Sequence, residues 1–162
     1  MGSGLGMVIA HDYMRGMDED TDFHGAKLAL FIGGQLTVIQ RDDRPGLPWA
    51  GYLDLPGGGR EAAETPVECV LRETYEELGL SLTQRDLVWG RPFLTTEGTG
   101  WFFAAQLTAK ATQSVRFGSE GQCWALMPPE QYMTHPQAIP HFAARVRIVR
   151  QELGQIVCGP QP

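Results

Sequence analysis

Residues 55–80 constrain the fold of this chain more than any other segment. Three consecutive glycines precede a helix-start signal, in which Thr65 can act as the N-cap, Pro66 occupies the first helical position and Glu68 the third. Apolar positions then recur at helical spacing, and Gly79 can adopt the left-handed conformation that ends many helices. The pattern predicts a glycine-rich loop followed by a capped α-helix.

Three glutamates cluster on this predicted helix. Because an α-helix turns by about 100° per residue, Glu73, Glu76 and Glu77 lie within about one third of its circumference. Like charges four residues apart destabilise a helix by about 0.2–0.5 kcal/mol per pair, and the negative end of the helix dipole disfavours them further. Another interaction must compensate this charge. Carboxylates are hard ligands that suit Mg²⁺ or Mn²⁺, whereas a solvated acidic face is the alternative interpretation.

The glycines favour the metal interpretation, because glycine lets the backbone come close to a metal ion or a phosphate. Together, loop and helix resemble the Nudix box, G-x5-E-x7-R-E-U-x-E-E-x-G-U, where U is aliphatic. The matching positions are Gly58, Glu64, Arg72, Glu73, Glu76, Glu77, Gly79 and Leu80. Thr74 departs from the pattern, since an aliphatic residue is usual there. We expect a small packing effect and no loss of metal binding.

The resemblance implies roles for the matching residues. The metal would be bound by the main-chain carbonyl of Gly57 and by the catalytic carboxylates of Glu73, Glu76 and Glu77. Glu64 and Arg72 would support the site as a pair that orients this cluster. Gly58 and Gly59 would contact the substrate. Glu73 is the first candidate for the base that accepts a proton from the attacking water.

Further candidates lie outside this segment. The sequence SEGQ around Glu120 resembles the EGQ segment of MutT-like members, so Glu120 is an additional candidate metal ligand and catalytic carboxylate; an ordinary loop glutamate is the equal alternative. Arg41 ends a predicted strand, where an arginine can touch substrate in MutT-like members; an exposed arginine is the alternative. Trp49, Trp101 and Phe102 could stack on a base, although burial is the commoner explanation for such aromatics.

The remaining sequence predicts strands around the helix. Residues 27–40 form a predicted β-hairpin with a Gly-Gly turn, and a loop follows over 42–52. Further strands are expected at 52–55, 87–94, 101–107 and 122–126, with a turn at 98–100. A helical turn after Pro128 and a last helix from near Pro140 follow, the latter with Phe142, Val146, Val149 and Leu153 on its buried face. This order predicts an α+β fold, an α/β/α sandwich with a mixed β-sheet between helices, which is the Nudix fold that the resemblance implies.

The length of 162 residues suits one domain. We predict an N-terminal arm over residues 1–24, a single Nudix domain over 25–155 and a C-terminal tail over 156–162. Gly2-Ser3-Gly4 in the arm is compatible with residues added by cloning. Neither a signal peptide nor an apolar run of the ~18 residues that span a membrane is recognised.

Charge and cysteine content restrict the partners. The formal charge of −6 argues against binding to a nucleic-acid polymer, which needs a basic surface, but not against a small polyanion held by metal ions. Cys69, Cys123 and Cys158 are widely spaced and odd in number, which predicts reduced thiols in a cytoplasmic protein without membrane contact. A monomer and a homodimer both remain open.

The resemblance implies a Nudix hydrolase, an enzyme that acts on acid anhydrides. It would use Mg²⁺ or Mn²⁺ to hydrolyse a phosphoanhydride bond in a nucleotide substrate, a nucleoside di- or triphosphate, by in-line attack of water on phosphorus. The EGQ segment favours a MutT-like nucleoside triphosphate pyrophosphohydrolase. The alternatives are an ADP-ribose or nucleotide-sugar pyrophosphatase, a non-catalytic nucleotide-sensing Nudix module, and an acidic helix that meets a basic protein partner.

Overall fold

A computed structural model describes residues 22–157 of the chain, with side chains as far as Gly154. Most of the predicted N-terminal arm, the end of the predicted tail and Cys158 lie outside the described residues. The domain limits at residues 25 and 155 therefore stay predictions. Cys69 is buried, Cys123 is exposed, and neither forms a disulfide.

The predicted hairpin is present. Strand β1, Gly25–Ile32, pairs antiparallel with β2, Gln35–Gln40. The turn residues Gly33 and Gly34 have φ angles of 57° and 81°, which glycine adopts at little cost. The two glycines are thus explained by the turn geometry.

The sheet is mixed and seven-stranded, with the order β3-β2-β1-β6-β5, while β4 pairs with β1 and β7 with β2. The additional strands are β3 (Leu53–Asp54), β4 (Gly57–Gly59), β5 (Leu87–Thr95), β6 (Gly98–Leu107) and β7 (Cys123–Met127). Strands β1 and β6 run parallel over their pairing, and the other paired strands are antiparallel. The mixed sheet is as expected.

The turn between β5 and β6 differs from the prediction of a turn at 98–100. Strand β6 already begins at Gly98, whose Cα lies opposite Thr95, so the turn consists of residues 96 and 97. The Thr95 hydroxyl donates to the carbonyl of Gly98 at 2.8 Å and accepts from the amide of Glu97 at 3.1 Å. These two hydrogen bonds close the turn before the glycines, which then pair within the strand.

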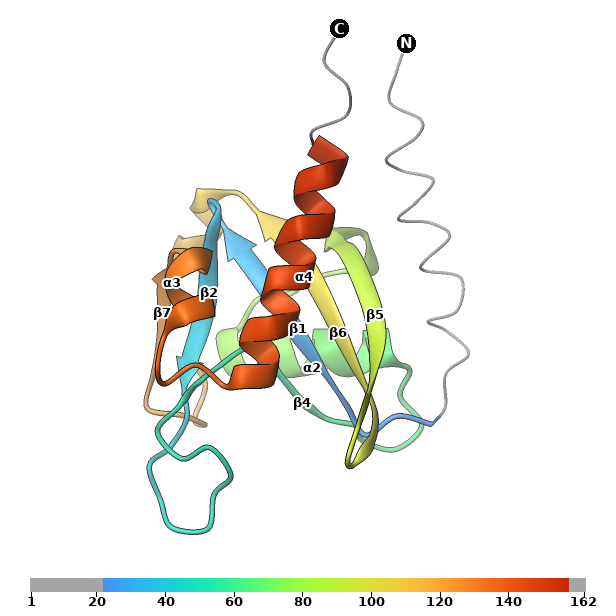
Figure 1. Ribbon diagram of the computed structural model, residues 1–162, viewed down its shortest axis with the longest axis vertical. Coiled ribbons are helices and arrows are strands. Elements are labelled where there is room, and N and C mark those ends of the chain that lie inside the picture. The colour runs from blue at the N-terminus through green and yellow to red at the C-terminus, as the bar shows by residue number, and fades with distance from the viewer. Residues whose placement is uncertain (1–21, 158–162) are drawn as a thin grey trace, which may run out of the picture.

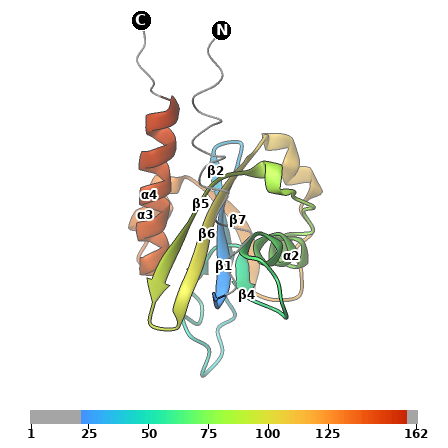
Figure 2. The same ribbon diagram turned by 90° about the vertical axis from the view of Figure 1, so that its right-hand side faces the viewer.

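The helices agree with the start and stop signals. Helix α2, Pro66–Leu78, has a complete capping box between Thr65 and Glu68, and it ends at Gly79 with φ of 66°. Helix α3 spans Pro129–Thr134 and α4 spans Pro140–Val157. Two short 3-10 helices, Gln84–Asp86 and Ala109–Ser114, connect other elements. Figures 1 and 2 show α2 and α4 on opposite faces of the sheet.

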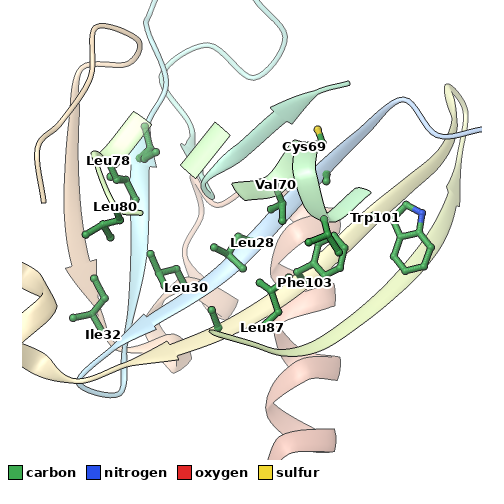
Figure 3. Close-up of a cluster of buried hydrophobic side chains, with 14 of the residues drawn as sticks. Leu28, Leu30, Ile32, Cys69, Val70, Leu78, Leu80, Leu87, Trp101 and Phe103 are labelled. Carbon is green, nitrogen blue, oxygen red and sulfur yellow. The ribbon is translucent and has the colours of Figure 1, made fainter. Parts of the chain in front are cut away.

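Alternation along the strands builds a core on each face of the sheet. Leu28 and Leu30 of β1 pack toward α2, where Val70 is buried (Figure 3). Ala29 and Phe31 belong to the other cluster, which includes residues of α4. Successive strand residues point to opposite faces, so one strand serves both cores. On α4, Phe142, Val146 and Val149 are buried and Leu153 is partly buried, which confirms the predicted apolar face.

Thr74 is fully buried in α2 without an unsatisfied hydroxyl. Its Oγ1 donates to the carbonyl of Val70, one helical turn earlier, at 2.7 Å. A threonine therefore replaces the usual aliphatic residue without leaving a polar atom unpaired in the core. No helix in the described part of the chain is long and apolar enough to cross a membrane.

Candidate active site

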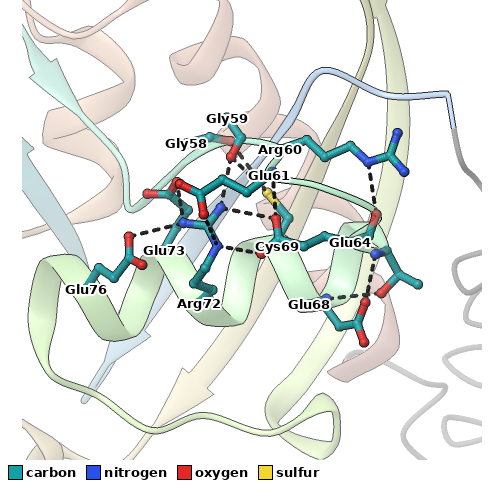
Figure 4. A network of polar contacts seen from close by, with 11 residues as sticks. Gly58, Gly59, Arg60, Glu61, Glu64, Glu68, Cys69, Arg72, Glu73 and Glu76 are labelled. Carbon is teal, nitrogen blue, oxygen red and sulfur yellow. Dashed lines mark hydrogen bonds and ion pairs between the residues drawn. The ribbon is translucent and has the colours of Figure 1, made fainter.

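Arg72 is the centre of a network that joins α2 to the preceding loop (Figure 4). Its guanidinium donates to both carboxylate oxygens of Glu64 and, at 2.9 Å, to the carbonyl of Gly59. The Nη1 atom also donates to Glu73 at 2.9 Å and to Glu76 at 3.1 Å. One arginine thus holds two of the three clustered glutamates. It also holds both ends of the loop, through Gly59 and Glu64.

Glu64 and Arg72 form an ion pair whose surroundings favour the charged form of both side chains. The hydrogen bond from Arg72 is the largest cause that lowers the pKa of Glu64, and the amide of Glu61 donates to the same carboxylate at 2.9 Å. The same bond to Glu64 raises the pKa of Arg72. Both groups therefore stay charged near neutral pH and hold the loop against the helix.

Two glycines bring the loop into contact with the glutamates. The amide of Gly57 donates to Glu77 at 2.8 Å, with a φ of 122° at Gly57. A Cβ at Gly57 would lie 2.2 Å from the carbonyl oxygen of Ala26, and one at Gly58 would lie 2.6 Å from the carboxyl carbon of Glu73. Only glycine permits both approaches, because real Cβ atoms do not come this close to other heavy atoms.

Burial makes two of the glutamates costly to ionise. Desolvation raises the pKa of Glu77 to about 7, although the charge of Lys27 and the Gly57 amide act in the opposite direction. Desolvation also raises the pKa of Glu73, against the effect of Arg72. Oxygen donors of this kind have the chemistry that a hard divalent cation prefers.

Hydrogen bonds within the protein hold these glutamate side chains in place. Across residues 22–154, no group of three or more acidic, histidine or cysteine side chains is arranged to hold a metal ion. Glu73 and Glu76 contact Arg72, and Glu77 contacts the amide of Gly57. The donor chemistry fits a divalent cation, and binding one would exchange some of these contacts for metal bonds.

A cleft of about 920 Å³ runs from these glutamates past the edge of the sheet to α4. Among its lining residues are the predicted site residues Arg41, Gly57, Gly58, Gly59, Glu73, Glu77 and Glu120. Glu76 does not line it, and half of that side chain (54%) is exposed. The structure thus brings most of the predicted residues to one cleft and places Glu76 outside its wall.

Glu120 reaches the cleft from the loop before β7. Its side chain is exposed and also lines a smaller cavity of about 110 Å³, together with Arg41, Asp54 and Glu77. The next residues hold this loop in place, since the side chain of Gln122 donates to the carbonyl of Arg41 at 2.8 Å. The loop glutamate therefore faces the same space as a box glutamate.

Lys27 and Asp54 are site residues that the sequence analysis did not identify. The Lys27 ammonium donates to Asp54 at 3.0 Å, to the carbonyl of Leu55 at 3.1 Å and to that of Gly57 at 2.7 Å. Asp54 is 4% exposed and also accepts from Arg41 at 2.8 Å. Two features of the sequence could have indicated them: a lysine within an apolar strand, and an aspartate in the strand before the glycines.

Of the aromatic candidates, Phe102 and Trp101 are buried and Trp49 is exposed, and both tryptophans line the cleft. Phe102 is fully buried, and Trp101 is 6% exposed and stacks on Phe103. Trp49 is 42% exposed and lines the cleft, with its ring centroid 6.1 Å from that of His141. Helix α4 supplies His141, Phe142 and Arg145 to the cleft, and none of these was predicted, because nothing in the helix sequence marks its end as part of a site.

Known structures share this architecture. The MutT protein from Methanosarcina mazei Go1 is 20% identical with a TM-score of 0.65, and 83% of this chain and 97% of that one are covered. An Ap4A hydrolase from C. elegans is 17% identical with a TM-score of 0.63, over 81% and 98% of the two chains. The NUDIX domain of Shewanella oneidensis NrtR, complexed with ADP ribose, is 16% identical with a TM-score of 0.59, over 88% and 97%. At these identities the likeness shows the fold.

A family description matches most of the chain. The NUDIX domain is matched over residues 23–156, which include all elements of the sheet. No curated protein sequence gives a significant match. The fold predicted from the sequence is confirmed. The chain belongs to the NUDIX domain family.

Proposed function

We propose that this chain is a Nudix hydrolase, an enzyme that hydrolyses a phosphoanhydride bond in a nucleoside di- or triphosphate, with Mg²⁺ or Mn²⁺ as cofactor. The observation that carries the proposal is that Glu73, Glu77 and Glu120 line one cleft together with Lys27 and Arg41. Carboxylates suit the metal, and the cations suit phosphate. The volume of about 920 Å³ lies within the range of small-molecule sites.

The metal would be held by the carboxylates of Glu73, Glu76, Glu77 and Glu120 and by the carbonyl of Gly57. When bound, it would lower the pKa of a water molecule and neutralise charge that develops on the phosphates. The carbonyl of Gly57 already accepts from Lys27, but a carbonyl oxygen has two lone pairs and can take a second partner. Arg72 and Glu64 position the cluster without contact to substrate.

Glu73 is the first candidate for the general base and Glu120 the second. Burial raises the pKa of Glu73 toward the range in which a carboxylate accepts a proton efficiently. Its carboxylate lies directly under Gly58, so a phosphate at the glycine loop would be close to it. Glu120 is exposed, and such a position suits a metal ligand or a base equally.

The substrate is proposed to be a nucleoside triphosphate, which a MutT-like enzyme would cleave to a monophosphate and pyrophosphate. Support comes from the EGQ segment, because its Glu120 and the box residue Glu77 line the same small cavity. Arg41, Gly58 and Gly59 would contact this substrate. We further propose a cytoplasmic monomer or homodimer that binds neither nucleic-acid polymers nor membranes.

The test is release of phosphate or pyrophosphate from a panel of nucleotides, with and without Mg²⁺ or Mn²⁺. The panel contains canonical and oxidised nucleoside triphosphates, ADP-ribose, dinucleoside polyphosphates and nucleotide sugars. We expect turnover that requires the metal and is lost in Glu77→Gln and Glu76→Gln. Preferred turnover of ADP-ribose or a nucleotide sugar would replace the triphosphate assignment. Binding without turnover would contradict the hydrolase and favour a nucleotide sensor.

A further inference from the structure

Three cationic side chains, those of Lys27, Arg41 and Arg145, line the cleft, and they differ in how their hydrogen bonds are used. An ammonium group has three N–H donors. Lys27 donates all three, to the carboxylate of Asp54 and to the carbonyls of Leu55 and Gly57. Arg41 donates to Asp54 at 2.8 Å and to the carbonyl of Pro48 at 3.0 Å. Both cations are thus engaged within the protein.

Arg145 of α4 is the exception. Within residues 22–154 its guanidinium has neither a hydrogen bond nor an ion pair, and it lines the cleft. Its Cζ lies over three aromatic rings, 4.6 Å from the centroid of Phe93, 5.6 Å from Phe142 and 5.9 Å from Phe102. Arg145 is partly buried, and within residues 22–154 its five N–H donors have aromatic rings beside them but no protein acceptor.

Keeping the guanidinium of Arg145 charged in these surroundings costs free energy unless an anion binds to it. Burial lowers the pKa of Arg145, which shows that its charge is partly removed from water. The neighbouring His141 does not supply a negative charge, and burial followed by the charge of Arg145 lowers the pKa of that histidine. Within residues 22–154 no carboxylate pairs with this charge, and only the faces of the three aromatic rings contact it.

Arg145 and the glycine loop line the same cleft. The Nζ of Lys27 is 5.5 Å from the centroid of the Phe142 ring, the same ring that Arg145 contacts. Lys27 in turn donates to the carbonyl of Gly57, which contacts Glu77 through its amide. The glutamates, Lys27 and Arg145 thus line one continuous cleft, in which a single ligand can contact more than one of them.

We propose that Arg145 binds a phosphoryl group of the substrate that the glutamate wall does not hold. This rests on the proposed function, since it assigns a second anion contact in the same cleft. A guanidinium can donate two parallel hydrogen bonds to phosphate oxygens, and the rings hold its plane in place. This contact gives the partly desolvated guanidinium a hydrogen-bond acceptor. It also adds selectivity for ligands that carry more phosphate groups.

The test measures ligand binding by calorimetry in Mg²⁺ to the whole chain and to Arg145→Met, which keeps an apolar stem on the rings. The probes are the α,β-methylene triphosphates of adenosine and guanosine, the two nucleosides without phosphate, and imidodiphosphate, which has no base. We expect Arg145→Met to weaken both triphosphates and imidodiphosphate by about 10–100-fold, and the nucleosides not at all. Arg145→Lys should recover part of the loss.

The matched control is Arg147→Met on the same helix. Arg147 is exposed, lies outside the cleft lining and makes one long bond, 3.5 Å, to the carbonyl of Met133. It should bind all probes as the wild type does. Thermal melting of each variant separates a folding defect from a binding defect, and Arg145→Lys carries the test if Arg145→Met does not fold.

Two results would overturn the inference alone. One is unchanged binding in folded Arg145 variants; the other is a loss that follows the base and leaves imidodiphosphate unaffected, which would assign Arg145 to base recognition. In both, the wild type still binds and hydrolyses nucleotides. A wild type that binds none of the probes and turns over no nucleotide would instead overturn the proposed function, and this inference with it.

Discussion

The two walls of the cleft are built in different ways. The glutamate wall comes from one continuous stretch, residues 57–77, in which a glycine loop and a capped helix are joined by Arg72. The cationic wall combines Lys27 of β1, Asp54 of β3 and Arg145 of α4, which lie far apart in the sequence. A local motif thus supplies Glu73 and Glu77, whereas the tertiary fold brings Glu120 and the cationic side chains to the same cleft.

The difference explains how chemistry and recognition can vary separately. The spacing of residues in the acidic wall follows from helix geometry and from two close glycine contacts, so few substitutions are compatible with it. The cationic wall depends on where separate elements meet, and each can change its side chains without disturbing the helix. We expect substitutions in the acidic wall to affect turnover and those in the cationic wall to affect substrate choice.

The largest effect is expected for Glu73→Gln. If this carboxylate accepts the proton, turnover should fall by about 10³-fold while metal affinity is retained. Steady-state kinetics and metal titration check this, with Glu130→Gln on α3, far from the cleft, as the control. Activity near that of the wild type would show that the base lies elsewhere, with Glu120 next in line.

Asp54→Ala tests whether the cationic wall needs its buried carboxylate. Removing it leaves Lys27 and Arg41 without their common partner, so the free energy of unfolding should fall by about 2–3 kcal/mol. Urea denaturation measures the loss. Glu130→Ala, which breaks the exposed pair with Arg150, should cause no comparable change, and equal effects of the two variants would contradict a structural role for Asp54.

The paired variants Gly57→Ala and Gly58→Ala separate fold from chemistry within the acidic wall. At Gly57 a methyl group would meet rigid backbone and a positive φ, so we expect a loss of about 2 kcal/mol in stability. At Gly58 the methyl would meet only the carboxylate of Glu73, which can move. Denaturation curves should show a smaller loss there, while kinetics should show reduced turnover. The reverse order of stabilities would refute the contact geometry.

Glu77 predicts a pH dependence of the metal-free protein. Its pKa is raised to about 7 in the folded state, above the ordinary value of 4.5. The protonated form is therefore favoured by folding, so this contribution to stability is present below about pH 4.5 and is lost as the pH rises through 7. The measurement is the free energy of unfolding at several pH values in a chelator, with Glu77→Gln subtracted. A flat difference between wild type and variant would contradict the burial effect.

The smallest effect is expected for Thr74→Val. The threonine hydroxyl bonds only to the carbonyl of Val70 in its own helix, so a valine of similar shape should change stability by less than about 1 kcal/mol. Turnover should not change. A large loss of activity in Thr74→Val would mean that this hydroxyl, and not only the eight matched box positions, acts in the site.

The sequence predicted the acidic half because its signals are local. A capping box, a left-handed glycine and an i, i+3, i+4 glutamate pattern are each specified by neighbouring residues, and the structure contains the helix they describe. Lys27, Asp54 and Arg145 escaped prediction because a charged residue within a strand or helix does not indicate which distant residue it meets. The β5–β6 turn was misplaced by two residues because the Thr95 hydroxyl, and not glycine, closes it.

The parallel pairing of β1 and β6 has a consequence for the order of folding. Gly25 lies opposite Gly100 in this ladder, so a long intervening chain must close before the two strands meet. Closing long loops costs conformational entropy and slows folding. Arg145 follows β6 in the chain, so it can join the cleft only after β6 has been synthesised and α4 has packed on the sheet. We therefore expect the cationic wall of the cleft to be complete only late in the folding of each new chain.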